Sequence, residues 1–486
     1  MEMDRRDFIK HSGLVTSALL ASSTGSGQSA PGSEEIASKG NKKNKSSVIV
    51  AGGGIAGLSN AYELMKRGHE VTVLEASQRA GGHVRTIHDP LAEGLYADLG
   101  AEQCTKPGYE IYRAYADEFD LELLPYPRRT DQLTYIRDKP YTEEMLRDRK
   151  VLLGFGFSKR EASYMSENGI NELPSLFYRP YLDAFEDEYQ PFGVGLEDLD
   201  LMAVKDLLKR ENASERALLY FGGSSASALQ AIWNAAILKH RKVPLIPTDL
   251  FRIKGGNQRM IDAFATRLGS RIRLGSPVTK IEHSDSGVTV HFKEFGESQS
   301  MTADYLVNAI PLAILHRIPI EPYWSEEKAW VIKNTTYDFQ SRIVFQTRTP
   351  FWKREGYSPN IACRLPHLHL VWEMAEEVKG DRSILIGSAN AGTTPEQALN
   401  AYRKRYPGKS IEIEHTLAHH WIQDPWAPVC ERQVFGLGKL KRFWPEIIRP
   451  HGRIHFAGAY ADNLSWGQEA ATRSANRVAR EIDEAS

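Results

Sequence analysis

Residues 48–57 of this 486-residue chain read VIVAGGGIAG, and this stretch decides the fold. Its β-branched residues predict a strand, which leads into glycines with the spacing G-x-G-x-x-G. In a strand–turn–helix unit, Gly52 permits the tight turn, Gly54 lets the backbone approach a phosphate, and Gly57 lets helix and strand pack closely. The stretch therefore predicts a dinucleotide-binding turn.

The residues after this turn have a helical pattern from Leu58 to Arg67. The N-terminus of such a helix presents unpaired N–H groups and the positive end of the helix dipole, which together suit a pyrophosphate. Ile55 and Ala56 lie at its start. We therefore expect both to contact the cofactor.

A second predicted strand, residues 71–74, ends at Glu75, roughly 20 residues after Gly52 as in dinucleotide-binding βαβ units. A carboxylate at this place accepts hydrogen bonds from a ribose hydroxyl and disfavours a 2′-phosphate. The nucleotide is therefore FAD or NAD, with Ala76 beside Glu75 as a further candidate contact. The fold class that follows is α/β, with a Rossmann-like domain.

Residues 75–86 read EASQRAGGHVRT. This segment resembles the flavin-containing amine oxidase family, in which R-x-G-G-R-x-x-[ST] follows the first βαβ unit, and the resemblance selects FAD over NAD. Gly81 and Gly82 would allow close approach to a phosphate, and Arg79 and Arg85 would neutralise its charge. The chain departs from the family at His83, where arginine is usual, so that Arg85 would take over one phosphate contact.

The resemblance covers nearly everything after the first 46 residues. Val278 lies in a strand similar to the one that meets the adenine, and Gly458 ends a segment similar to the family's second flavin motif. Gln468 opens the closing helix, whose N-terminus would face the flavin N1–C2=O locus and stabilise the reduced ring. The segments that carry the resemblance here are 252–257, 275–281, 304–311, 452–458 and 466–469.

The resemblance implies a Rossmann-like FAD-binding domain interleaved with an α+β substrate domain, and a chain of this length exceeds one hydrophobic core. The expected FAD-binding segments are 47–107, 251–318 and 422–486. The expected substrate-domain segments are 108–250, which is mainly helical, and 319–421, which is mainly sheet.

The net charge of −1 suggests neither a nucleic acid nor an anionic membrane as a partner. No apolar window reaches the roughly 18 residues of a stable membrane span. Three cysteines do not make a disulfide framework, and their spacing suggests no metal site.

Residues 1–46 read as a leader rather than as part of the fold. Arg5 and Arg6 precede Phe8 and a mildly apolar stretch at 13–22. This pattern resembles a twin-arginine (Tat) export signal. It predicts the Tat machinery as a partner and a periplasmic or exported protein, since that route carries proteins already folded around a cofactor.

The resemblance implies FAD-dependent oxidative deamination of a primary or secondary amine. The flavin takes hydride from the carbon next to nitrogen, water hydrolyses the imine to an aldehyde or ketone, and O2 is reduced to H2O2. Three alternatives stay open: an L-amino-acid oxidase, a flavin dehydrogenase or desaturase acting on a non-amine, and a binding protein with a structural flavin.

Two residues are the catalytic candidates. Arg342 falls where the family holds a lysine near flavin N5; it could orient water or pair with a substrate carboxylate. The family's cage tyrosine falls on Gly467, so either Trp466 beside it supplies the aromatic wall or the cage is open.

Two further positions bear on the substrate and on the flavin. Gln103 stands where venom-type L-amino-acid oxidases place a carboxylate-binding arginine, which favours amines. Cys430 matches the cysteine that carries the flavin covalently in monoamine oxidases, although Val429 and Glu431 replace its usual neighbours.

Overall fold

The computed structural model describes residues 45–486 except 224–225, 357, 433 and 465. The predicted Tat signal therefore lies outside the described residues. Within the described part of the chain, no helix is both long and apolar enough to cross a bilayer.

The nucleotide-binding half is built on a parallel five-stranded sheet. Its strands come from distant parts of the chain, which gives the interleaving expected from the motif order. Their order is β10 (Ile272–Arg273), β2 (Glu70–Leu74), β1 (Ser47–Ala51), β14 (Tyr305–Asn308) and β23 (Ile454–Phe456). The predicted α/β fold with a parallel sheet is thus confirmed.

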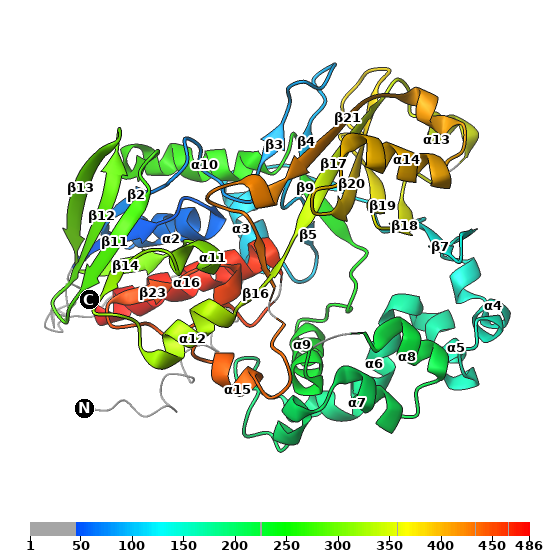
Figure 1. Ribbon diagram of the computed structural model, residues 1–486, viewed down its shortest axis with the longest axis horizontal. Coiled ribbons are helices and arrows are strands. Elements are labelled where there is room, and N and C mark those ends of the chain that lie inside the picture. The colour runs from blue at the N-terminus through cyan, green and yellow to red at the C-terminus, as the bar shows by residue number, and fades with distance from the viewer. Residues whose placement is uncertain (1–44, 224–225, 357, 433, 465) are drawn as a thin grey trace, which may run out of the picture. The chain divides into compact units, whose positions relative to one another are not determined.

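Alternating residues of β1 build the two faces of this sheet, because successive side chains of a strand point to opposite sides. Val48 and Val50 pack with the helical layer, and Ile49 and Ala51 belong to the core on the other face. The helices are α2 (Ile55–Lys66), α10 (Gln258–Leu268) and α16 (Gly467–Ala485), of which α2 and α16 run side by side (Figure 1).

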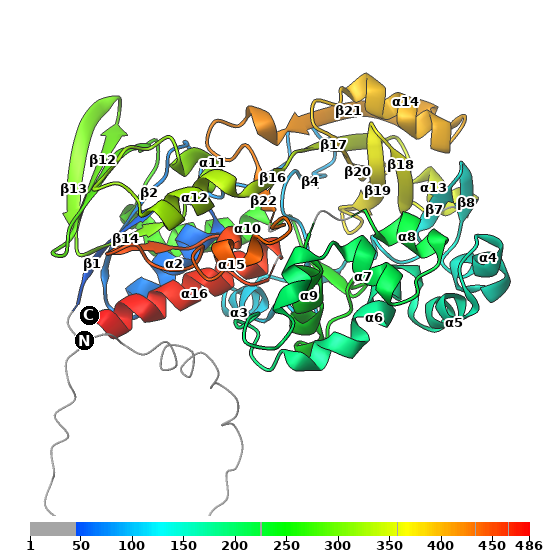
Figure 2. The same cartoon turned by 60° about the horizontal axis from the view of Figure 1, so that its bottom comes forward.

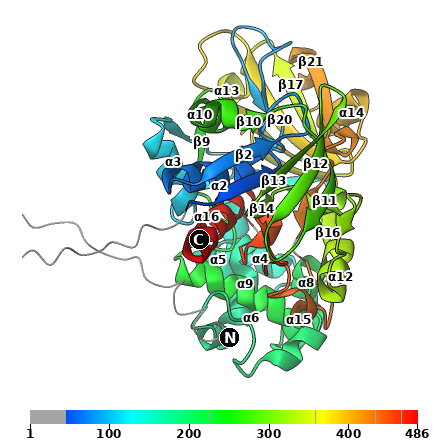
Figure 3. The same cartoon turned by 90° about the vertical axis from the view of Figure 1, so that its left-hand side faces the viewer.

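A second sheet covers the other face of the parallel strands (Figure 3). Its core residues include Ile281 and Val290, which share one cluster with Ile49. The strand order is β13 (Glu297–Ala303), β12 (Val288–Glu294), β11 (Val278–His283) and β15 (Ile320–Glu321).

A seven-stranded sheet forms the other half of the structure. Its order is β21 (Ile413–His420), β17 (Gln340–Thr347), β20 (Ser383–Asn390), β19 (Leu368–Met374), β18 (Ile361–Leu365), β7 (Leu133–Ile136) and β8 (Lys139–Tyr141). Strands β17, β19 and β20 fall in 319–421, the segment expected to be mainly sheet. Helix α14 (Pro395–Arg405) places Tyr402 against Phe345 of this sheet.

Helices gather beside this sheet between residues 149 and 240 (Figure 2). They fall in 108–250, the segment expected to be mainly helical, and Ser227 caps the last of them by accepting the N–H of Gln230. The helices are α4 (Arg149–Gly154), α5 (Lys159–Asn168), α6 (Leu173–Tyr178), α7 (Val204–Arg210), α8 (Glu215–Phe221) and α9 (Ala228–His240).

Helix α3 (Glu110–Glu118) falls in the segment expected to build the substrate domain, yet it packs with α2 and α16. The buried carboxylate of Glu469 in α16 accepts the N–H groups of Ile111 and Tyr112, at 3.2 and 2.9 Å. The domain limits 47–107, 108–250, 251–318, 319–421 and 422–486 stay predictions.

Short elements complete the fold. The strands are β3 (Thr86–Ile87), β4 (Ala97–Asp98), β5 (Cys104–Thr105), β6 (Leu123–Pro125), β9 (Leu250–Ile253), β16 (Thr336–Asp338) and β22 (Cys430–Arg432). The helices are α11 (Leu312–Leu315), α12 (Glu326–Asn334), α13 (Phe351–Glu355) and α15 (Leu440–Phe443).

Candidate functional site

A cavity of about 670 Å³ is bounded by the glycine turn after β1, the N-terminus of α16, the start of β17 and the segment 421–430. Most of the predicted cofactor contacts line it: Gly52, Gly54, Ile55, Ala56, Glu75, Ala76, Arg79, Gly81, Gly82, Val278, Gly458 and Gln468. Gly57 and Arg85 are not among the lining residues.

The three glycines of the turn differ in what surrounds them. Gly52 has φ +109°, and a Cβ there would lie 2.8 Å from the carbonyl oxygen of Ala309. A Cβ on Gly57 would lie 1.9 Å from the carbonyl oxygen of Gly52, so Gly57 acts through packing beneath the cavity. A Cβ on Gly54 would meet no atom within 4 Å. Because Gly54 lines the cavity, this open space can take a ligand phosphate.

The N-terminus of α2 adds the donors that such a phosphate needs. Its first intrahelical hydrogen bond runs from the N–H of Leu58 to the carbonyl of Gly54 at 2.9 Å. The N–H groups before it, those of Ile55, Ala56 and Gly57, therefore have no intrahelical acceptor. The first turn of α2 carries no acidic residue that would offset the positive end of the helix dipole. This helix N-terminus therefore favours binding of an anion.

Glu75 is held rigidly at the end of β2. Its carboxylate accepts the N–H of Gly53 at 2.6 Å and that of Ser77 at 2.8 Å. The side chain lines the cavity while the residue is 7% exposed. A carboxylate oxygen can accept more than one hydrogen bond, so Glu75 can also receive a ribose hydroxyl.

Arg79 organises the second glycine pair. Its guanidinium donates to the carbonyls of Gly82 at 2.7 Å and Val84 at 3.1 Å, and burial lowers its pKa. Arg79 therefore shapes the turn as well as adding positive charge to the cavity wall. Arg85, expected to replace the missing arginine, is placed outside that wall.

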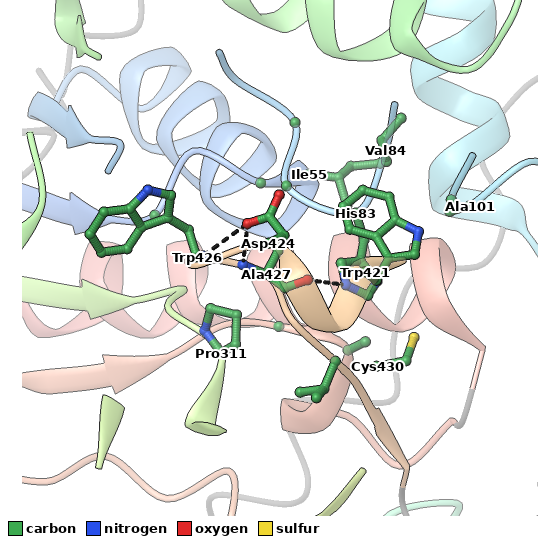
Figure 4. Close-up of a pocket in the computed structure, with 18 of the residues that line it drawn as sticks. Ile55, His83, Val84, Ala101, Pro311, Trp421, Asp424, Trp426, Ala427 and Cys430 are labelled. Carbon is green, nitrogen blue, oxygen red and sulfur yellow. Dashed lines mark hydrogen bonds between the residues drawn. The ribbon is translucent and has the colours of Figure 1, made fainter. Parts of the chain in front are cut away.

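His83 takes a role that the sequence did not reveal. Its Nε2 lies 2.7 Å from the carbonyl oxygen of Ala427, and its ring lies against Trp421 with centroids 4.3 Å apart and the ring planes tilted by 32° (Figure 4). Burial lowers the pKa of the imidazole, so the neutral ring donates from Nε2. His83 thereby connects the turn 81–84 with the segment 421–427, and residues of both segments line the cavity.

Gln468 and Gln103 supply polar atoms at the α16 end of the cavity. The Nε2 of Gln468 donates to the carbonyl of Gln103 at 3.1 Å, and its Oε1 accepts from Asn257. The Oε1 of Gln103 is buried and has no hydrogen-bond partner among the described residues. Gln103 lines the cavity, but this oxygen is itself buried and is not exposed at the cavity surface.

The two catalytic candidates are placed differently. Arg342 lines the cavity, donates to the carbonyl of Gly100 at 3.0 Å and pairs with Glu102 at 3.6 Å. Trp466 is not in the lining; it stacks on Tyr109 with ring centroids 5.5 Å apart. Gly467 lines the cavity, and a Cβ there would meet nothing within 4 Å. The space of the expected cage tyrosine is therefore open.

Cys430 is exposed, lines the cavity and lies opposite Asp338 in the β16–β22 pair. Covalent attachment of the flavin at this thiol stays a prediction. Within the described part of the chain, no cluster of His, Cys, Asp or Glu is arranged to hold a metal ion.

Several lining residues were not singled out as ligands from the sequence: Glu102, Arg128, Asp424 and Trp426. Asp424 shapes the loop by accepting the N–H groups of Trp426 and Ala427, both at 2.9 Å (Figure 4). The Asp-Pro pair at 424–425 is a turn signal that could have marked this loop. No local pattern marks Glu102 or Arg128.

Comparison with known proteins agrees with this geometry. Residues 55–483 match the family described as flavin containing amine oxidoreductase. The chain is 25% identical to the L-amino-acid oxidase BmooLAAO-I of Bothrops moojeni, over 93% of this chain and 92% of that protein.

Two solved structures share the fold. One is wild-type putrescine oxidase bound to putrescine, with a TM-score of 0.75, 21% identity, and 90% of this chain and 99% of that one covered. The other is cyclohexylamine oxidase from Brevibacterium oxydans IH-35A, with a TM-score of 0.74, 20% identity, and 91% and 99% covered.

The chain belongs to the flavin-containing amine oxidoreductase family. It is an FAD-dependent oxidoreductase acting on amines. The cavity fits FAD: the open cradle at Gly54 and the free donors of α2 suit the pyrophosphate, Glu75 suits a ribose, and the α16 N-terminus suits the flavin ring.

Proposed function

We propose that the protein catalyses oxidation of a primary or secondary amine by O2, giving an aldehyde or ketone, the released amine or ammonia, and H2O2. One observation carries the proposal: a single cavity joins the dinucleotide turn to the N-terminus of α16, and its wall there carries Gln103 where venom-type L-amino-acid oxidases are expected to have a carboxylate-binding arginine.

The chain's own residues account for the remaining requirements. Bound FAD supplies a two-electron acceptor for hydride from the carbon that carries nitrogen. The ring of Trp421 and the side chain of Val429 make the wall largely apolar there, and an apolar wall favours loss of a proton from the substrate ammonium. The N–H groups at the start of α16 favour negative charge on the reduced cofactor.

A second candidate, L-amino-acid oxidation, has specific support. The relative from Bothrops moojeni carries that activity in its name, and Arg342 in the cavity wall could pair with a substrate carboxylate. Gln103 supports amines instead, since it replaces the arginine expected of venom-type enzymes.

The test is anaerobic mixing of the purified flavoprotein with a panel of amines and L-amino acids, followed near 450 nm. Bleaching by an amine, reversed by air with release of H2O2, supports the amine oxidase. Bleaching by amino acids alone supports the second candidate. Substrate oxidation that leaves O2 unreduced indicates a dehydrogenase, and a flavin that nothing bleaches contradicts the proposal.

We further propose Tat-dependent export, which rests on Arg5 and Arg6 at the N-terminus. Replacing both by lysine keeps the charge and should leave the holoprotein in the cytoplasm. Immunoblots of periplasmic and cytoplasmic fractions measure this, and unchanged distribution of the double variant would exclude the Tat route.

A further inference from the structure

Asp98, at the end of β4, is a fully buried acid beside the start of helix α10. Its two carboxylate oxygens lie 3.1 and 3.3 Å from the backbone nitrogen of Asn257, whose N–H they accept. One of them also accepts a short hydrogen bond from the hydroxyl of Thr86 in β3. Asp98 does not line the cavity, so it does not meet a ligand directly.

A chain of hydrogen bonds leads from Asp98 to the cavity. Asn257, whose backbone holds Asp98, donates from Nδ2 to Oε1 of Gln468 at 3.3 Å. Gln468 donates in turn from Nε2 to the carbonyl of Gln103 at 3.1 Å, and both glutamines line the cavity. Because both ends of its amide are bonded, Gln468 has a fixed orientation. Bonds in such a chain polarise one another.

This chain ends at the free N–H groups of α16. The first hydrogen bond of this helix runs from the N–H of Ala470 to the carbonyl of Trp466 at 3.1 Å. The N–H groups before it have no intrahelical acceptor; they belong to Gly467, Gln468 and Glu469. This is the positive end of the helix dipole, and it suits the flavin ring. A negative charge nearby opposes the negative charge that reduction adds there.

The surroundings of Asp98 make its charge variable. Its pKa is raised to about 7, mainly by burial, and the hydrogen bonds from Thr86 and Asn257 act against this rise. The titratable side chains that face it come from three elements: Glu102 after β4, Arg252 of β9 and Tyr112 of α3. The charge of Glu102 raises the pKa and that of Arg252 lowers it. Asp98 therefore changes charge close to neutral pH.

The neighbouring charges are bound elsewhere. Arg252 pairs with Glu376 and Glu377 at 2.5 and 2.6 Å. Glu102 accepts a short hydrogen bond from Arg128 and lies 3.6 Å from Nη1 of Arg342. These pairs stay ionised at neutral pH and give a constant background to the titration of Asp98.

A second buried acid, Glu469, lies in the first turn of α16. Burial raises its pKa to about 7 as well. Its carboxylate accepts the N–H groups of Ile111 and Tyr112, so its hydrogen bonds lead to the backbone of α3. Glu469 is outside the cavity lining, whereas the hydrogen bonds of Asp98 lead to Gln468 in the cavity wall.

We propose that Asp98 is a positioning residue for the bound flavin, and that its charge, acting through Asn257 and Gln468, sets how strongly the start of α16 favours the reduced cofactor. The ionised carboxylate opposes reduction, and the protonated one does not. The flavin should therefore be a stronger oxidant when Asp98 carries its proton. The inference needs FAD in the cavity but not the identity of the substrate.

The experiment measures the midpoint potential of FAD in the holoenzyme against pH, by reduction beside a redox dye and without substrate. The wild-type profile should bend near pH 7. Asp98→Asn keeps the shape of the side chain but cannot ionise, so this bend should be absent. At about pH 8.5 reduction of the variant should be favoured about tenfold over the wild type, ~30 mV for two electrons, and at about pH 5.5 the two should agree.

Two further variants test the path and the position. Asn257→Ala removes the side-chain link to Gln468 but leaves the backbone N–H that Asp98 accepts, so the bend should become smaller. Asp200→Asn is the matched control, because Asp200 is also a buried aspartate with a raised pKa and does not line the cavity. Its profile should equal that of the wild type.

The outcomes separate this inference from the proposed function. A wild-type profile without a bend near pH 7 overturns the inference, and so does a bend that survives unchanged in Asp98→Asn or in Asn257→Ala. A bend that only Glu469→Gln removes overturns it as well. Melting temperature and FAD content identify variants that fail to fold, and the wild-type profile then decides. Each of these results leaves the proposed oxidation of amines to the substrate panel.

Discussion

Two glycines of the dinucleotide turn can each be replaced by alanine, which adds the same methyl group at a packed position and at an open one. In Gly57→Ala the new methyl would lie 1.9 Å from the carbonyl oxygen of Gly52 and 3.2 Å from Cγ1 of Val50. Ordinary contacts between such atoms are about 3.5 Å, so α2 must move by more than 1 Å away from β1. In Gly54→Ala the same methyl meets no protein atom within 4 Å, and φ −73° suits alanine.

The two variants should therefore separate folding from cofactor binding. Overpacking of this kind costs about 1–3 kcal/mol, so Gly57→Ala should lower the melting temperature of the apoprotein. Gly54→Ala should leave that temperature unchanged but fill the space of the pyrophosphate; a loss of about 1.4–2.8 kcal/mol corresponds to a 10- to 100-fold higher Kd for FAD.

Differential scanning fluorimetry of the apoproteins and titration with FAD, followed by quenching of flavin fluorescence, measure the two effects. Wild-type FAD affinity in Gly54→Ala would refute the assignment of this space to the pyrophosphate. An apoprotein of Gly57→Ala as stable as the wild type would refute the packing argument.

Three further outcomes are expected. Burial lowers the pKa of Lys328 to about 8, so between pH 8 and 10.5 the unfolded chain binds more protons than the folded protein. The free energy of unfolding of the wild type should therefore rise over that pH range relative to Lys328→Met, by up to about 3 kcal/mol in urea unfolding. Parallel pH profiles of the two proteins would contradict this. His83→Phe keeps an aromatic ring against Trp421 but leaves the carbonyl of Ala427 unpaired, at a cost of about 1–3 kcal/mol. FAD should therefore dissociate faster from this variant during gel filtration. If the variant retains as much FAD as the wild type, His83 does not hold these two segments of the cavity wall together. Cys430→Ala should change nothing unless the flavin is covalent; acid precipitation tests this, since a yellow wild-type pellet that turns white in the variant would establish the covalent bond.

Much of the nucleotide-binding half could be predicted because its chemistry is local. The turn at 52–57, the helix after it and Glu75 lie close together in sequence, and their roles depend on backbone geometry that short spacings define. Val278 and Gly458 could be placed only through resemblance to a family, since strand pairing brings them to the cavity from distant segments.

The sequence by itself determined the parallel sheet, the dinucleotide turn and the family, because glycine spacing and β-branched runs restrict the backbone directly. Only the tertiary structure showed that Glu102 and Arg128 face the cavity beside Arg342, which resemblance to a family had already marked as a catalytic candidate. An arginine in a loop, such as Arg128, reads in the sequence as a solvated charge. Folding brings Arg128 and Arg342 to Glu102, which lies more than 20 residues from either along the chain. Only the packed structure defines those distances and that burial, which together give the charges their effect.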